Sequence, residues 1–130
     1  MKKISFHILR VGLAITFLWI GLLILREPEV WGGYIAPWAL DLMPIPIREA
    51  MIGTGIFDVA VGIFLLIDFW VWLVALVGAG HLVIVLVVSG INEGTVRDIA
   101  ILAGAFALVV DSLPKNLTEK INPWRKRGRI

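Results

Sequence analysis

Four apolar segments limit what this chain can fold into. Each is long enough, or nearly long enough, to cross a lipid bilayer as a helix, and they lie at residues 5–25, 49–67, 70–89 and 97–113. A hydrocarbon core about 30 Å thick is crossed by about 20 residues of helix. A helix satisfies its own backbone hydrogen bonds within lipid, so segments of this length favour helices. We therefore predict an all-α fold, an integral membrane four-helix bundle.

The composition supports a membrane domain. Hydrophobic residues make up 59% of the 130 residues, and the mean hydropathy of +0.93 is higher than a soluble domain normally has. We expect one domain over residues 1–113 and a basic tail over 114–130. The sequence contains no cysteine, which excludes disulfides and thiol redox chemistry within the chain.

The basic residues gather at the two ends of the chain. Lys2 and Lys3 precede the first segment, whereas the connection 26–48 has two basic residues against three acidic ones. The positive-inside rule then predicts a multi-pass protein of the cell membrane with both termini cytoplasmic. Its expected partner is the lipid bilayer and not nucleic acid, although the isoelectric point is near 9.3. The basic residues after the last segment are Lys115, Lys120, Arg125, Lys126, Arg127 and Arg129.

The connection 26–48 is rich in aromatic residues and lies outside the membrane in this topology. Trp31, Tyr34 and Trp38 occur within it, and amphipathic rings are typical of the headgroup region. An interfacial belt is therefore favoured over a stacking site for a ligand. Because the connection is apolar and long, we expect it to fold back and cap the outer mouth of the bundle.

Carboxyl groups near the segment ends have structural interpretations. Asp68 is almost the whole connection between the second and third segments, which predicts a helix N-cap. Thr95 and Asp98 have the spacing of a capping box, and Glu49 suits the positive end of a helix. Glu49, Arg97 and Asp98 are also candidates for the outer mouth, together with the aromatic residues of the connection.

Four ionisable residues lie inside or near the apolar zone: Arg10, Asp58, His81 and Asp111. An aspartate at the centre of a membrane helix costs about 3 kcal/mol, so it is usually paired, buried or functional. Counted from the cytoplasmic helix ends, Arg10, Asp58 and His81 lie roughly 8, 14 and 17 Å deep. We predict that these three form a cluster. Asp111, at the negative end of its helix, should pair with Arg10 or with a lysine of the tail.

Two interpretations of this cluster stay open. It is either a buried ion pair that sets helix register, or a site for ligand binding or proton exchange. Small residues such as Gly21, Gly55 and Gly62 flank the polar positions and would let the helices approach closely. A metal site is not expected, because His81 has no second histidine at ligand spacing.

The order of these features resembles the DoxX family of small four-span membrane proteins. LRVGLAITFLWIGL at 9–22 is similar to its arginine-containing first helix, and GGYIAPWALDLMP at 32–44 to its first connection. GIFDVAVGIFLL at 55–66 resembles its Gly-x-x-Glu-x-x-x-Gly helix, with Asp58 at the acidic position, and VRDIAILAGAFAL at 96–108 resembles its closing helix. The resemblance covers residues 9–113.

The resemblance implies a role beside quinone-linked redox chemistry in the membrane. The expected function is an accessory, non-catalytic subunit that binds a lipophilic quinone or a respiratory partner, with no intrinsic cofactor. One alternative is a small permease or lipid-binding protein, which would need a homo-oligomer to enclose an aqueous path. Another is an assembly factor with no ligand. Asp58 is shorter by one methylene than the family's usual glutamate, which changes its reach.

Overall fold

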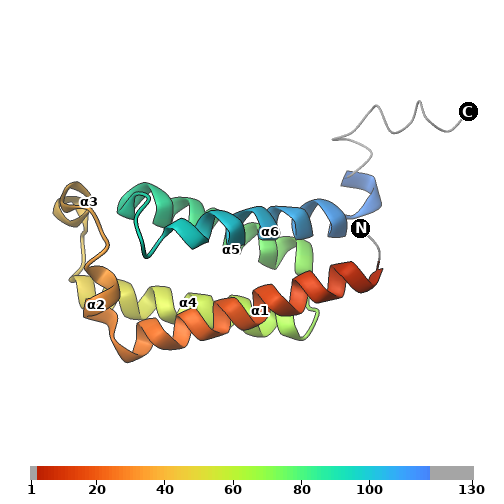
Figure 1. Ribbon diagram of the computed structural model, residues 1–130, viewed down its shortest axis with the longest axis horizontal. Coiled ribbons are helices and arrows are strands. Elements are labelled where there is room, and N and C mark those ends of the chain that lie inside the picture. Colours follow the sequence, from red (N-terminus) through yellow and green to blue (C-terminus); the bar gives the residue numbers. More distant parts are fainter. Residues whose placement is uncertain (1–2, 118–130) are drawn as a thin grey trace, which may run out of the picture.

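The computed structural model describes residues 3–117, and every regular element in this range is a helix (Figure 1). The all-α class is thereby confirmed. Long helices occupy the apolar segments, and two short helices lie in the first connection. The elements are α1 (Lys3–Arg26), α2 (Pro28–Gly32), α3 (Pro37–Leu42), α4 (Ile47–Leu66), α5 (Val71–Ser89) and α6 (Val96–Ser112).

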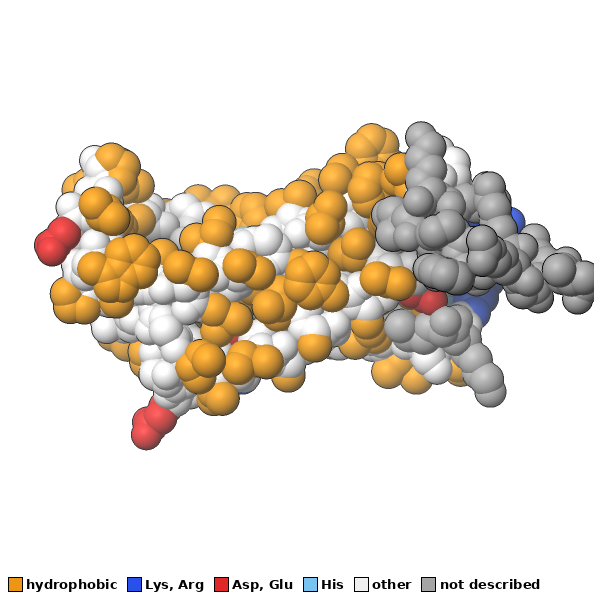
Figure 2. Space-filling model, turned by 90° about the horizontal axis from the view of Figure 1, so that it is seen from above, with side chains coloured by type: hydrophobic (Ala, Val, Ile, Leu, Met, Phe, Trp, Pro, Cys, Tyr) orange, Lys and Arg blue, Asp and Glu red, His pale blue; other side chains and the backbone are white. Residues whose placement is uncertain are grey.

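Within residues 3–117, three helices are long and apolar enough to cross a membrane: α1, α4 and α5. Large hydrophobic side chains are exposed along them, including Ile8, Trp19, Ile56 and Ile84. Figure 2 shows hydrophobic side chains distributed along the length of the visible face. A soluble protein would not expose so much apolar surface, whereas lipid accommodates it. The fourth expected span, α6, has 17 residues, which is shorter than the length of about 20 that a full crossing takes.

The long helices are arranged as two pairs, α1 with α4 and α5 with α6, which lie alongside each other (Figure 1). The contact between α1 and α4 is the closest because glycines lie in it. A Cβ atom added to Gly62 would come within 2.7 Å of the backbone nitrogen of Leu18 and 2.9 Å of the carbonyl oxygen of Ala14. Small residues therefore bring two backbones together here, as the sequence indicates.

The hydrophobic core fills one end of the molecule. This end holds the start of α1, the connection between α4 and α5, and the end of α6 (Figure 1). Leu65 and Leu108 are its largest fully buried side chains, and Leu13, Val71 and Val109 pack with them. At the opposite end lie α2, α3 and the connection between α5 and α6. Most of the basic residues that predict orientation, among them Lys2 and Lys120, lie outside the described residues.

The prediction that Asp68 caps α5 is wrong. The N-cap position of α5 is Trp70, and no side-chain hydrogen bond caps this helix in the described part of the chain. Asp68 has φ = 61°, a left-handed conformation that aspartate tolerates in tight turns. Its carboxylate Oδ1 lies 3.6 Å from Nε of Arg10. The carboxyl group therefore faces α1 instead of the first turn of α5.

Candidate ligand-binding cavity

A cavity of about 150 Å³ lies between the two helix pairs. Its walls come from all four long helices, together with α2 and the segment that follows α2. The lining is mostly apolar and includes Phe17 and Ile20 of α1 and Leu82 and Val85 of α5. The molecule is thus filled by its core at one end and hollow toward the other.

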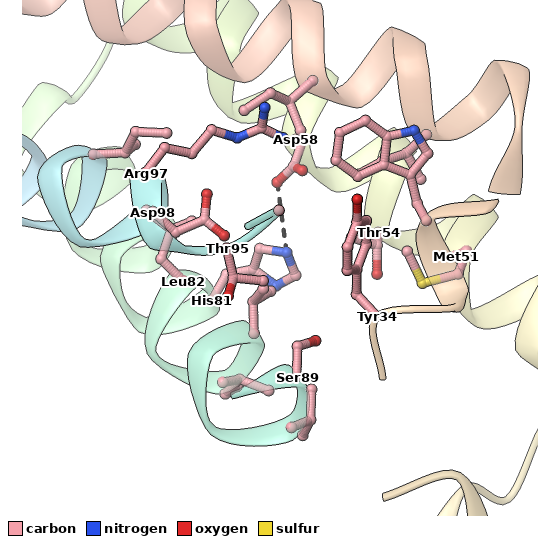
Figure 3. Close-up of a pocket in the computed structure, with 18 of the residues that line it drawn as sticks. Tyr34, Met51, Thr54, Asp58, His81, Leu82, Ser89, Thr95, Arg97 and Asp98 are labelled. Carbon is pink, nitrogen blue, oxygen red and sulfur yellow. Dashed lines mark ion pairs between the residues drawn. The ribbon is translucent and has the colours of Figure 1, made fainter. Parts of the chain in front are cut away.

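Asp58 and His81 meet at the wall of this cavity. Asp58 projects from α4 and is 5% exposed, and its Oδ1 lies 3.5 Å from Nε2 of His81 on α5 (Figure 3). The ring of Phe57 packs against the His81 ring at 4.7 Å between centroids. The structure therefore brings together two members of the predicted cluster.

The two facing atoms are not hydrogen-bonded to each other. Asp58 Oδ1 and His81 Nε2 are both buried, and neither has a hydrogen-bond partner among residues 3–117. A buried polar atom without a partner costs about 1–3 kcal/mol. In a folded protein, such atoms indicate a bound water, a bound ligand or a functional role.

The prediction that Arg10 joins this cluster is wrong. Its Nη1 donates to the carbonyl oxygens of Leu65 and Leu66 at 2.6 and 2.9 Å, and its Nε donates to His7 Nδ1 at 3.2 Å. The last turn of a helix has carbonyl groups without intrahelical partners. Arg10 therefore binds the end of α4, where these acceptors are, about two turns from Asp58.

Asp98 belongs to the cavity and not to a capping box. The Thr95 hydroxyl donates to the carbonyl of Gly90 and accepts from the backbone N–H of Asn92 at 3.0 Å. In the described part of the chain, no side-chain hydrogen bond caps α6. Asp98 is 7% exposed and lines the cavity. Its carboxyl group lies on the same side of the cavity as Asp58 and His81 (Figure 3).

Aromatic residues of the first connection close the cavity at the end of the molecule that holds α2 and α3 (Figure 1). The guanidinium carbon of Arg97 lies 5.2 Å from the centroid of the Trp31 ring, a cation–π contact. The Tyr34 ring packs so closely on Gly94 that an added Cβ would lie 2.6 Å from its Cζ. Nearby, the backbone N–H of Ala36 donates to the carbonyl of Val88 at 2.8 Å. These contacts hold the connection against α5 and α6.

Three sequence candidates lie away from the cavity lining. Trp38, on α3, is 52% exposed, and Glu49 is exposed in the first turn of α4. Asp111 is exposed in the last turn of α6, at the filled end of the molecule. The lysines proposed for Asp111 lie outside the described residues, apart from Lys115.

Sequence reasoning missed the cavity's polar residues other than those already named. The hydroxyl-bearing residues Thr16, Thr54 and Ser89 also line the cavity. A lone hydroxyl in an apolar segment is ordinary, so nothing in the sequence marks these positions. The described residues contain no group of three side chains that could hold a metal ion.

Comparison of the chain with protein-family models, with curated proteins and with solved structures gives no match. The resemblance to the DoxX family stays a prediction from the sequence. The cavity itself offers an apolar volume, two carboxyl groups, one imidazole and a guanidinium. Such a set can bind a small molecule with one polar head, and it can exchange a proton with that head.

Proposed function

We propose that this protein is a four-helix, multi-pass protein of the cell membrane that binds a lipophilic small molecule in the cavity. Both termini lie in the cytoplasm, and the cavity lies in the outer half of the bilayer. One observation carries the proposal: Asp58 Oδ1 and His81 Nε2 are buried at the wall of a mostly apolar cavity, and neither atom has a hydrogen bond among residues 3–117. A ligand with a hydrogen-bonding head satisfies both atoms, and its hydrocarbon part fills the remaining space.

The size of the cavity supports a small head group. A dry, apolar cavity of roughly 150 Å³ holds a molecule such as benzene. The cavity of about 150 Å³ found here therefore accommodates one six-membered ring. The two buried atoms without hydrogen bonds among residues 3–117 lie on α4 and α5, so a head group placed between them contacts both helices.

The resemblance in sequence implies a quinone as the ligand and a role as an accessory, non-catalytic subunit. A quinone head is a single ring with two oxygens, and its size suits the cavity. Because a quinone oxygen accepts hydrogen bonds, His81, or Asp58 in its protonated form, would donate a hydrogen bond or a proton to it. A respiratory or redox complex in the same membrane would be the partner, and a short-tailed quinone is therefore the first probe to use.

The test places a larger side chain in the cavity and measures the binding of a quinone. Val85 lines the cavity, so Val85→Phe should occupy it and weaken the binding of decylubiquinone to protein in nanodiscs by at least about tenfold, the effect of about 1.4 kcal/mol. The matched control is Val83→Phe, the same change on α5 at a residue that is 42% exposed and outside the lining. Quenching of tryptophan fluorescence measures binding, because Trp31 lines the cavity.

Equal binding by the wild type, Val85→Phe and Val83→Phe would show that the cavity is not the binding site. If the wild type binds no lipophilic probe at all, the proposal fails.

The Arg10 to Asp58 pair required by a purely structural register role is not formed, which favours the ligand-binding interpretation.

A further inference from the structure

We propose that the cavity selects a cationic head group, so that its ligand is a lipophilic amine. This inference rests on the proposed function, since it assumes that the cavity holds a lipophilic molecule. It adds the charge and the hydrogen-bonding character of the head. Two carboxyl groups that line one cavity, and the residues around them, determine this preference.

The two carboxyl groups come from different helices. Asp58 projects from α4 and Asp98 from the first turn of α6, and both line the cavity. Their residues are 5% and 7% exposed, and Figure 3 shows both carboxyl groups beside the same space as His81. Two buried acids at one site repel each other unless positive charge or a proton lies between them.

Among residues 3–117, the positive charge of Arg97 acts on Asp98, but no arginine forms an ion pair with Asp58 or Asp98. The arginine ion pairs found there join Arg10 to Asp68 and Arg48 to Glu29. Arg97, which also lines the cavity, has its guanidinium over the Trp31 ring. Asp58 has His81 at 3.5 Å, but its Oδ1 makes no hydrogen bond within residues 3–117.

The unpartnered atom defines what the ligand must provide. The Asp58 side chain is 7% exposed, and a carboxylate oxygen accepts hydrogen bonds but does not donate them. A head group that donates and carries positive charge satisfies this oxygen and offsets the charge of Asp98. An ammonium group does both, whereas an anionic head would be repelled by both carboxylates.

The rest of the lining suits the same ligand. The rings of Phe17, Trp31 and Tyr34 line the cavity, and aromatic faces attract cations. The guanidinium of Arg97 over the Trp31 ring is one such contact. The aliphatic wall then takes the hydrocarbon part of the ligand.

The experiment compares three molecules with one carbon skeleton: phenylpropylamine, phenylpropanol and phenylpropanoate. Binding is measured by calorimetry to protein in phosphatidylcholine nanodiscs, with empty nanodiscs subtracted. The amine should bind at least about tenfold more tightly than the alcohol, because hydrogen bonds to charged groups are the stronger ones. The carboxylate should bind most weakly.

Two variants and one control assign the preference to the carboxyl groups. Asp58→Asn and Asp98→Asn should each reduce amine binding by at least about tenfold, while binding of the alcohol persists and shows that the cavity is still formed. Asp41→Asn is the control, since Asp41 is exposed on α3, and it should leave all three affinities unchanged.

Equal affinity for the amine and the alcohol overturns the inference, and so does amine binding that survives both variants. If decylubiquinone binds in a manner sensitive to Val85→Phe while the amine does not bind, the inference fails and the proposed function stands. If Val85→Phe changes the binding of none of the probes, the proposed function fails as well.

Discussion

Arg10 and Asp58 are both ionisable residues inside apolar helices, but they differ in their hydrogen bonds. Arg10 is 9% exposed and makes charge-assisted hydrogen bonds to two carbonyl groups at the end of α4. Asp58 is 5% exposed, and its Oδ1 lacks a hydrogen-bond partner among the described residues. Arg10 therefore stabilises the fold, whereas Asp58 imposes a cost on it. Residues that cost stability are expected at functional sites.

The first prediction concerns Arg10. Arg10→Met should lower the free energy of unfolding by about 2–4 kcal/mol, because it removes charge-assisted hydrogen bonds to the carbonyl groups at the end of α4. Thermal unfolding in detergent, followed by circular dichroism, measures the loss. Arg48→Met is the control, since Arg48 and Glu29 form an ion pair whose side chains are 58% and 69% exposed. Its effect should stay within about 0.5 kcal/mol.

A double-mutant cycle with Asp58→Asn distinguishes this role from the pairing that the sequence predicts. Seven residues of helix, about 10 Å, separate Asp58 from the carbonyl of Leu65 that Arg10 binds. The effects of Arg10→Met and Asp58→Asn should therefore add to within about 0.5 kcal/mol. A coupling energy of several kcal/mol would mean that the two side chains interact directly.

The chemical type of these residues was easier to predict than their partners. Polar groups in apolar helices are visible in the sequence, so the sequence indicates Arg10, Asp58 and His81. The partner of Arg10 was not, because backbone carbonyls at a helix end carry no sequence signal. The spacing of Thr95 and Asp98 predicts a capping box, and Asp98 is also a candidate for the outer mouth. The Thr95 hydroxyl instead bonds to the turn before α6.

At the scale of the helices, α1 and α4 form the closest packed unit, and glycines determine how near they come. A Cβ at Gly21 would lie 2.8 Å from the carbonyl oxygen of Gly55, and Gly62 meets the backbone of α1 in the same way. Hydropathy and prolines predict where the long helices lie. The short helices were not predicted as helices, although Pro28 and Pro37 occupy their first turns, where proline is favoured.

The second prediction tests this contact. Gly62→Ala should lower the free energy of unfolding by about 1–3 kcal/mol, since the new methyl group meets backbone atoms that cannot move independently. Gly53→Ala is the matched control on the same helix, because a Cβ there would have nothing within 4 Å. It should be neutral, or stabilising by up to about 1 kcal/mol through helix propensity. Equal losses in the two variants would contradict the proposed packing.

At the scale of the whole molecule, the ends of the helix assembly have different roles. Side chains fill the end with the start of α1 and the end of α6, and Arg10 binds α4 there. The end with α2 and α3 holds the cavity and the aromatic residues Trp31 and Tyr34 that close it. The packed end is suited to fixing the helices, and the hollow end to receiving a ligand. Periodicity and composition do not predict which end is packed and which end holds the cavity, because the same apolar helices run through both ends.

The third prediction concerns orientation in the membrane, which the sequence bases on lysine and arginine placement. The chain has no cysteine, so single cysteines report position without further changes. Asp41 and Glu93 are exposed at the hollow end, and Lys115 is exposed beyond α6. A membrane-impermeant maleimide added to intact cells should modify Asp41→Cys and Glu93→Cys. Lys115→Cys should react only after the membrane is permeabilised, and the reverse pattern, or labelling of all three from outside, would contradict the proposed topology.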